Sequence, residues 1–252
     1  MQDQFLNIKN GDVAMKAEAI LFDKDGTLMD FDAFWVPVSE KAMDTVLMQL
    51  QMDRALTKSI LEAIGVHNGV TDIDSVLCKG TYGQIGQIVH HVVCQYGREV
   101  SRETVTELVV SAYNAAMDAG QVRPTCLHLA EILQELKNRG IKLAVVTTDN
   151  DVVTANCLRK LGIADLFDRV YTDDGKTPTK PDPWCADDFC RQFCLEKGCV
   201  VMVGDTLTDV HFAQNAGIQV VGVAAREENR RLLAGQANLL VSSLSELPDV
   251  LT

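Results

Sequence analysis

The sequence lacks any apolar run of the roughly 20 residues that a membrane-spanning helix requires. Its first residues, Met1 to Gln4, show no basic segment followed by an apolar stretch, so we expect no secretory signal peptide and a cytoplasmic location. Basic residues are scarce: 23 Lys and Arg stand against 35 Asp and Glu, for a net charge of -12. Because nucleic acids and anionic membranes bind through neutralised phosphates, we expect neither as a partner.

Cysteine pairs of the zinc-binding type are also absent, because none of the eight cysteines belongs to a Cys-x-x-Cys motif. Four of them cluster from Cys185 to Cys199, and Cys190 and Cys194 would share one face of a helix. No histidine lies near this cluster. Buried free thiols are therefore favoured there, and a zinc site is the alternative.

Length and composition fit a soluble globular protein, with 252 residues of which 47% are hydrophobic and 23% charged. Short apolar runs predict six strands: Ala17–Phe22, Lys142–Val146, Val170–Tyr171, Cys199–Val203, Gln219–Val223 and Leu239–Val241. Amphipathic segments of helical period lie between most of them: Leu127–Arg139, Pro183–Lys197 and Asp209–Ala216. This alternation predicts an α/β fold with a doubly wound parallel sheet covered by helices on both faces.

One region breaks the alternation. From about Asp32 to Asp118 no strand-like run of useful length occurs, and helical patterns recur at Ser39–Leu50, Arg54–Ile64, Gln84–Gln95 and Arg102–Ala119. We therefore predict an all-helical cap domain over residues 32–120, inserted between core segments 1–31 and 121–252, with 1–14 as a possible extension. Such a domain is well placed to act as a lid that excludes water.

Two carboxylates, Asp23 and Asp25, follow the first predicted strand in the run Phe22-Asp23-Lys24-Asp25-Gly26-Thr27. Alternate residues of a strand point to one face, so this spacing can aim both carboxylates at one point. Gly26 allows a tight turn at the carboxyl end of the strand, where open α/β sheets bind ligands. Two close anions resist joint ionisation unless a cation or a shared proton relieves them, which suits a metal-assisted nucleophile and an acid/base pair.

The second predicted strand ends in Thr147-Thr148-Asp149-Asn150. A hydroxyl at this point, together with backbone N–H groups at the start of the following helix, would form a pocket for an anion. The alternative is that Thr147 or Asp149 only caps that helix.

Lys180 precedes the rigid segment Pro181-Asp182-Pro183, which would present its ammonium as a fixed charge, although an ordinary loop lysine is the alternative. Asp205 follows the predicted strand Cys199–Val203 at its tip and Asp209 comes one helical turn later, so both can face one cation. A donor set of carboxylate oxygens without His or Cys favours magnesium over zinc. The alternative makes Asp205 a helix N-cap.

As a set and in this order, the pattern Asp-x-Asp-Gly-Thr, strand-Thr, Lys-Pro and Gly-Asp-x-x-x-Asp resembles the haloacid dehalogenase-like superfamily, from about Lys16 to the carboxyl end. It is similar to the magnesium-dependent phosphohydrolases of that family, which have a Rossmann-like core and a helical cap inserted after the first strand.

The resemblance implies a role for each matching residue. It makes Asp23 the nucleophile that forms an aspartyl-phosphate, and Asp25 the general acid that later activates water. It implies that Mg²⁺ is held by Asp23, the backbone carbonyl of Asp25 and Asp205, with Asp209 supporting the metal's water shell or Lys180. It also makes Thr147, with Thr148 beside it, and Lys180 the groups that bind the phosphoryl oxygens.

An aspartate at position 25 selects phosphomonoester chemistry within the family, because the dehalogenases lack this acid. It does not separate hydrolysis from phosphosugar mutase chemistry. The segment Leu77–Gly83 is similar to the specificity loop of helical-cap members such as phosphoglycolate phosphatases and beta-phosphoglucomutases, and its Lys79 would reach a second anionic group on the substrate. The alternative for Lys79 is a solvated loop lysine, and a packing or surface role is favoured for His90.

We therefore expect a magnesium-dependent phosphatase that acts on a small phosphorylated metabolite, either phosphoglycolate-like or a sugar phosphate, as a monomer or homodimer. One alternative is a phosphosugar mutase. An alternative of another class is a non-catalytic regulatory or binding protein on the same scaffold.

Overall fold

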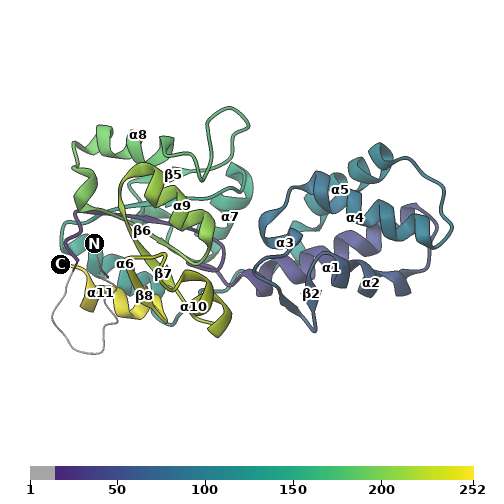
Figure 1. Cartoon of the computed structure of the whole chain (residues 1–252), viewed down its shortest axis with the longest axis horizontal. Helices are drawn as coiled ribbons and strands as arrows, with labels where there is room; N and C mark the ends of the chain where they lie inside the picture. The colour runs from purple at the N-terminus through teal and green to yellow at the C-terminus, as the bar shows by residue number, and fades with distance from the viewer. Residues whose placement is uncertain (1–14) are drawn as a thin grey trace. The chain divides into compact units, whose positions relative to one another are not determined.

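A computed structural model describes residues 15–252 of the chain. The possible extension over residues 1–14 lies outside the described residues. The described chain divides into two compact units, one formed by residues 15–30 and 123–252 and the other by residues 31–122 (Figure 1). None of the helices in residues 15–252 has both the length and the apolar character needed to cross a membrane.

The first unit contains a parallel sheet of six strands in the order β5-β4-β1-β6-β7-β8. Its strands are β1 (Ala19–Phe22), β4 (Lys142–Val146), β5 (Arg169–Tyr171), β6 (Val200–Gly204), β7 (Gln219–Val223) and β8 (Leu239–Val241). All six predicted strands are present, and neighbouring strands pair in parallel throughout. The predicted α/β fold with a doubly wound sheet is confirmed.

Helices connect these strands and cover both faces of the sheet. They are α6 (Leu129–Asn138), α7 (Asp151–Lys160), α8 (Trp184–Phe193), α9 (Leu207–Ala216), α10 (Glu227–Leu233) and α11 (Leu247–Val250). Single turns of 3-10 helix occur at Ala164–Leu166, Lys197–Cys199 and Leu244–Glu246.

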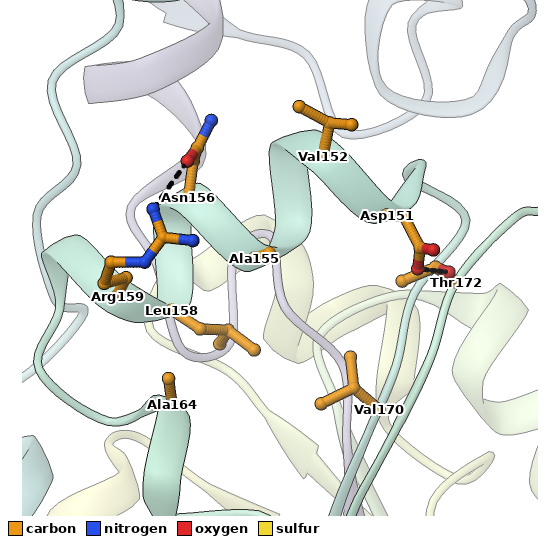
Figure 2. A pocket seen from close by; sticks show the side chains of 9 residues that line it. All are labelled: Asp151, Val152, Ala155, Asn156, Leu158, Arg159, Ala164, Val170 and Thr172. Atoms are coloured by element: carbon orange, nitrogen blue, oxygen red, sulfur yellow. Dashed lines mark hydrogen bonds between the residues drawn. The ribbon is translucent and has the colours of Figure 1, made fainter.

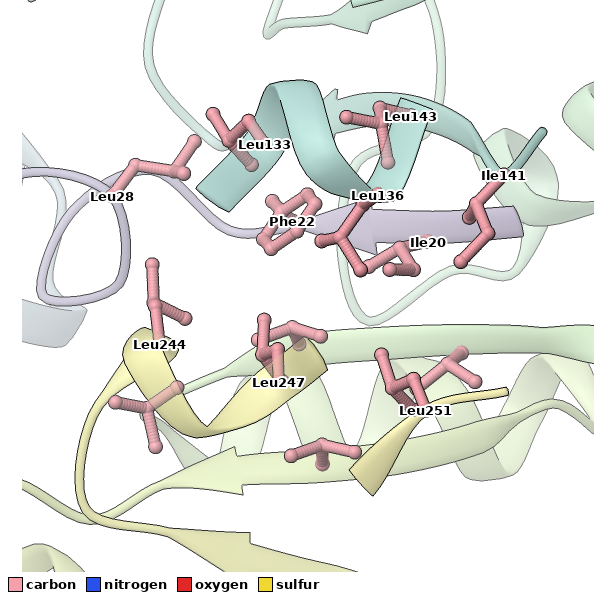
Figure 3. Packing of buried hydrophobic residues seen from close by; sticks show 14 of the residues in the cluster. Ile20, Phe22, Leu28, Leu133, Leu136, Ile141, Leu143, Leu244, Leu247 and Leu251 are labelled. Atoms are coloured by element: carbon pink, nitrogen blue, oxygen red, sulfur yellow. The ribbon is translucent and has the colours of Figure 1, made fainter. Parts of the chain in front are cut away.

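The alternation of side chains along β1 divides the core of this unit between the two faces of the sheet. Ile20 and Phe22 point to a face covered by α6 and the C-terminal segment, where they pack among leucines such as Leu133, Leu136 and Leu247 (Figure 3). Ala19 and Leu21 point to the opposite face, which α8 and α9 cover. Because apolar layers enclose β1 on both sides, the position of the strand is strongly fixed.

The register of the central strands brings three strand ends together. Phe22 of β1 lies opposite Val145 of β4 on one side and Val203 of β6 on the other. The chain leaves β1 at a point where the order of the strands reverses, since β4 and β6 flank it. Crevices at such switch points are where open α/β sheets bind ligands.

The second unit is mainly helical. It contains α1 (Phe31–Gln49), α2 (Thr57–Ala63), α3 (Val76–Lys79), α4 (Tyr82–Gln95) and α5 (Arg102–Ala116), with 3-10 turns at Arg54–Leu56 and Met117–Ala119. It also contains a short antiparallel hairpin of β2 (Val66–His67) and β3 (Val70–Thr71), so the prediction of an all-helical insertion was wrong at this point. Asn68 and Gly69 form its turn, both with positive φ.

Helix α1 begins eight residues before the predicted start at Ser39 and contains Pro37 in its interior. Proline has no N–H, so it cannot donate to the carbonyl of Ala33 as a helical residue normally would. The N–H of Gln121 donates to that carbonyl at 3.0 Å instead. A second segment of the chain thus replaces the missing helical bond and lets the helix continue through the proline.

Candidate active site

The centre of the site is a buried lysine held between two carboxylates. Lys180 lies in the loop between β5 and α8, and its Nζ is 2.5 Å from Asp23 Oδ1 and 2.7 Å from Asp209 Oδ1. Asp23 directly follows β1, and Asp209 stands in the first turn of α9. All three side chains are almost completely enclosed. Charged groups that are buried without such partners are costly, so the arrangement holds together only as a unit.

Asp205 completes this cluster at the end of β6. Its Oδ1 accepts a hydrogen bond from Thr27 Oγ1 at 3.2 Å, and its backbone carbonyl accepts one from Asn229 Nδ2 at 3.0 Å. One carboxylate oxygen from each of Asp23, Asp205 and Asp209 lies within 4.8 Å of the others. Three oxygen donors this close form a set that a hard divalent cation such as Mg²⁺ can bind.

The protonation of the cluster reflects its burial. Burial raises the pKa of Asp23, Lys180 opposes the rise, and the charges of Asp209 and Asp25 add to it, so that the pKa is about 7. Burial and the charges of Asp23 and Asp209 raise the pKa of Asp205 well above its usual range. Burial alone would lower the pKa of Lys180, but Asp209 and Asp23 raise it above its ordinary value. Three ionised carboxylates would carry more negative charge than one ammonium balances, and the raised pKa values of Asp23 and Asp205 express this excess.

Two glycines make room for these carboxylates. A Cβ atom on Gly26 would lie 2.2 Å from Asp205 Oδ2, and one on Gly204 would lie 2.3 Å from Asp209 Cγ. Gly26 also has a φ of +81°, which side chains rarely adopt. The backbone at Gly26 can thus lie this close to Asp205, and that at Gly204 this close to Asp209, only because these residues have no side chain.

We expect Gly26→Ala to lower the activity expected of this site by at least ~10-fold, because the added methyl group displaces Asp205 and the turn resists the required φ. Steady-state kinetics and thermal denaturation of the variant measure both effects. Gly175→Ala is the matched control, since Gly175 has a φ of +70° and a Cβ atom there would meet nothing within 4 Å. Full activity in Gly26→Ala would show that Asp205 is not held where the structure places it.

The threonines after β4 differ in their surroundings. Thr147 is buried, and its Oγ1 accepts a hydrogen bond from the N–H of Asp149 at 3.2 Å, whereas Thr148 is exposed. Asn150 caps α7 by accepting from the N–H of Val153 at 3.0 Å. The alternative in which Thr147 or Asp149 caps this helix was therefore wrong, because the helix begins one residue later.

The helix after β6 also begins one residue later than the alternative implied. The N-cap of α9 is Thr206, not Asp205, and Asp209 Oδ2 accepts both the N–H of Thr206 at 3.1 Å and its hydroxyl at 2.7 Å. The alternative role of Asp205 as an N-cap was wrong. Asp209 has one carboxylate oxygen on the helix start and the other on Lys180, which fixes its orientation.

Asp25 has a different lysine as its partner. Its Oδ2 lies 2.6 Å from Nζ of Lys24, and the same Nζ lies 2.9 Å from Asp149 Oδ2. The carboxylate of Asp25 is not part of the group formed by Asp23, Asp205 and Asp209. Burial raises the pKa of Asp149 to about 6, with the charge of Asp25 adding to the rise and Lys24 opposing it.

Other candidate residues have separate surroundings. Lys79 belongs to the helical unit, where it forms an ion pair with Asp74, and His90 Nε2 contacts the carbonyl of Val100 at 3.1 Å.

The cysteines from Cys185 to Cys199 are free thiols. Within residues 15–252, the acidic group described above is the one arrangement of His, Cys, Asp or Glu side chains able to hold a metal, so a zinc site among these cysteines was not found.

A cavity of about 600 Å³ lies away from these acidic groups, between α7 and β5 (Figure 2). Val152, Leu158 and Val170 give it an apolar lining, and Asp151 at its edge accepts a hydrogen bond from Thr172 at 2.6 Å. None of the residues predicted for the active site lines it.

Comparisons with known proteins agree with this architecture. The family model of the haloacid dehalogenase-like hydrolases matches residues 17–217. The chain therefore belongs to the haloacid dehalogenase-like hydrolase family, and the resemblance seen in its motifs is confirmed. The protein is thus an enzyme of the hydrolase class.

Relatives of known name share most of its length. A phosphoglycolate phosphatase of Neisseria meningitidis is 29% identical over 236 residues, which cover 91% of this chain and 92% of the relative. One from Pseudomonas fluorescens is 28% identical and covers 88% of this chain and 75% of its own.

Two solved structures share the fold. A Haemophilus somnus protein described as a predicted phosphoglycolate phosphatase has a TM-score of 0.70 at 20% identity, covering 93% of this chain and 97% of its own. A beta-phosphoglucomutase candidate from Thermotoga maritima has a TM-score of 0.62 at 23% identity, covering 92% and 97%.

Three residues at the site had no predicted role. Thr27, which donates to Asp205, and Lys24 both belong to the first motif, and a lysine between two aspartates is a signal of local pairing. Asn229, on α10, carried no signal, because its contact with the backbone of Asp205 depends on the packing of α10 against α9 and β7.

Proposed function

We propose that this hydrolase is a magnesium-dependent phosphatase of a small phosphorylated metabolite, with 2-phosphoglycolate as the first candidate substrate. The observation that carries the proposal is the Lys180 ammonium held 2.5 Å from Asp23 and 2.7 Å from Asp209. A fixed cation at this point can attract phosphoryl oxygens toward a carboxylate that would otherwise repel them. The names of the Neisseria and Pseudomonas relatives support the choice of substrate.

In the proposed reaction, a carboxylate oxygen of Asp23 attacks phosphorus and forms an acyl phosphate as the bond to the leaving oxygen breaks. Asp25 donates a proton to that oxygen, so the product leaves as an alcohol. Asp25 then takes a proton from a water molecule that attacks phosphorus, which releases inorganic phosphate and regenerates Asp23. Lys180 and Thr147 bind the phosphoryl oxygens in both steps.

Mg²⁺ fits the donor set because the three carboxylates offer only oxygen, and Gly26 leaves the space beside Asp205 open. Asp23, Asp205 and the carbonyl of Asp25 would hold the ion. Asp209 would act on its water shell or through Lys180, with which it already pairs. When bound, Mg²⁺ neutralises charge on the phosphoryl group and on the cluster.

A panel of phosphorylated metabolites, assayed for released phosphate with and without Mg²⁺, tests the proposal. We expect 2-phosphoglycolate to be among the best substrates and activity to disappear when the metal is chelated. If phosphate were released only from sugar phosphates, the proposed substrate would be wrong and the proposed reaction, hydrolysis of a phosphomonoester, would stand. Failure to hydrolyse any phosphomonoester, artificial ones included, would favour a binding or regulatory protein on the same scaffold.

The structural similarity to the beta-phosphoglucomutase candidate keeps a mutase as the second candidate function. The two reactions differ in the acceptor of the phosphoryl group, which is water for a phosphatase and a sugar hydroxyl for a mutase. Incubation with beta-glucose 1-phosphate separates them. The proposal expects free phosphate, whereas conversion to glucose 6-phosphate would favour the mutase.

We expect Mg²⁺ to raise the melting temperature more at about pH 8 than at about pH 5. The pKa of Asp23 is about 7 in the folded protein against an ordinary value of 3.8, so folding favours its protonated form. The stability from this protonation is complete below the ordinary value and is lost as the pH rises through about 7. Because Mg²⁺ requires the ionised carboxylate, it stabilises chiefly above that pH.

Thermal denaturation at several pH values, with Mg²⁺ or with an equal ionic strength of Na⁺, measures this dependence. At a concentration of one hundred times Kd, an ion that binds only the folded protein stabilises it by about 2.7 kcal/mol. An equal shift at both pH values would contradict binding through Asp23.

A further inference from the structure

Lys24 is a charged side chain in a fully enclosed position. It lies between Asp23 and Asp25 just after β1, and its side chain has no exposed surface, whereas that of Asp25 keeps 16%. A buried ammonium costs several kcal/mol unless its charge is paired, and an apolar side chain of similar volume would often be as stable. Packing alone therefore does not explain a lysine at this position.

The carboxylate of Asp149 forms the fixed end of a bridge through Lys24. Its Oδ2 is 2.9 Å from Lys24 Nζ. Its backbone N–H and carbonyl each form a hydrogen bond. The N–H of Asp149 donates to Thr147 Oγ1 at 3.2 Å, and its carbonyl accepts from the N–H of Asp173 at 2.8 Å. Because β4 is the neighbour of β1 in the sheet, this anchor stands beside the turn that carries Lys24.

Lys24 is also held at its backbone. Its carbonyl accepts the N–H groups of Leu28 and Met29, each at 2.9 Å, which closes the turn after β1. Both ends of the lysine are therefore fixed, the backbone by the turn and the ammonium by Asp149. Asp25 is a further partner, and its carboxylate lies 2.6 Å from Nζ at the partly exposed end of the bridge.

We propose that Lys24 is a positioning residue: anchored by Asp149, it holds the carboxyl group of Asp25 in the orientation for proton transfer to the leaving oxygen. The inference rests on the proposed function, in which Asp25 is the general acid. Lys24 itself keeps its protons throughout and does not touch the substrate. Its contribution is the alignment of the donor, on which general acid catalysis depends strongly.

Two substrates with different leaving groups test this role. An alkyl phosphate such as 2-phosphoglycolate needs a proton on its leaving oxygen, whereas p-nitrophenyl phosphate releases a stable anion without one. We expect Lys24→Met to lower kcat/KM for 2-phosphoglycolate by about 10²-fold, since a displacement of ~1 Å can cost that much. The comparison uses kcat/KM because this constant reports formation of the phosphoenzyme and not its hydrolysis, a step that Asp25 assists in the same way for both substrates. For p-nitrophenyl phosphate we expect a loss in kcat/KM of less than ~3-fold.

A purely structural role would give a different pattern. A loosened fold lowers the fraction of active enzyme, which reduces kcat/KM for both substrates by the same factor. Equal losses would therefore overturn the proposal. Lys16→Met, which removes an exposed lysine paired with Glu18, is the control and is expected to leave both activities unchanged.

The double variant Lys24→Met with Asp149→Asn covers the case in which the single variant does not fold. It removes the lysine and also the buried charge that the lysine would leave behind, so it keeps the interior neutral there. We expect the same selective loss for 2-phosphoglycolate. Similar losses with both substrates would again overturn the proposal.

A crystal structure of the Lys24→Met variant provides a readout that does not depend on activity. We expect β1 and Asp23 to stay in place while the Asp25 carboxylate rotates or occupies more than one conformer. An unmoved, single Asp25 conformer would overturn the positioning role. If the wild-type enzyme hydrolyses neither substrate, the proposed function fails, and this structure alone still decides the role of Lys24.

Discussion

Replacing the Asp23 carboxylate by an amide is expected to abolish turnover. In the proposed mechanism, Asp23→Asn removes the oxygen that attacks phosphorus and leaves the shape of the side chain nearly unchanged, so we expect kcat to fall by at least ~10⁴-fold. The amide still accepts a hydrogen bond from Lys180, whose Nζ lies 2.5 Å from Asp23 Oδ1. The variant should therefore fold, and circular dichroism and thermal denaturation check that it does.

The matched control is Asp165→Asn, because Asp165 is an exposed aspartate of the same unit. It is expected to keep full activity. An Asp23→Asn enzyme that hydrolyses 2-phosphoglycolate at even a tenth of the wild-type rate would mean that another group attacks phosphorus.

Lys180→Met is expected to have the second largest effect, on both stability and activity. Its removal leaves Asp23 and Asp209 buried without their common cation, and breaking a buried ion pair typically destabilises by about 3–5 kcal/mol. The loss of a fixed positive charge at the phosphoryl group is expected to lower kcat by about 10²–10³-fold. Urea denaturation and steady-state kinetics measure the two effects.

The destabilisation should shrink at low pH, where the carboxylates are protonated and no longer repel one another. Lys137→Met is the control, since Lys137 lies 3.5 Å from Asp168 in a partly exposed pair. Such pairs contribute up to about 1 kcal/mol, so this variant should stay close to the wild type. A Lys180→Met protein as stable as Lys137→Met would contradict the buried cluster.

Much of the core could be predicted from the sequence because its strands are buried on both faces. Such strands are short apolar runs, and the polar residues that follow each run mark the edge of the sheet where ligands bind. The structure brings Asp23, Lys180, Asp205 and Asp209 together as this reasoning expected. Their chemical roles stay predictions until they are measured.

Other features depended on contacts between distant segments and were missed. The helical pattern predicted a helix that starts at Ser39, but the bond from Gln121 to the carbonyl of Ala33 lets α1 begin at Phe31. The hairpin of β2 and β3 is different, because its Asn68-Gly69 turn is a strong local signal that the helical pattern around it obscured.

The ion pairs of Lys24 show most clearly what could not be predicted from the sequence. A lysine next to two aspartates is normally a solvated residue, and the strand pattern gives no reason to bury it. Lys24 can be buried because β4 lies next to β1 in the sheet. The segment after β4 places the carboxylate of Asp149 beside the turn after β1, where it pairs with Lys24. Only the fold brings these residues together.

The most direct test of the proposed mechanism is to trap the phosphorylated enzyme. The protein is mixed with a radiolabelled phosphomonoester and Mg²⁺, quenched in acid during turnover, and digested for mass spectrometry. The mechanism predicts a phosphoryl group on the peptide that contains Asp23, bound to that carboxylate and absent from Asp23→Asn. Label on another residue, or sustained turnover without any labelled enzyme, would contradict it.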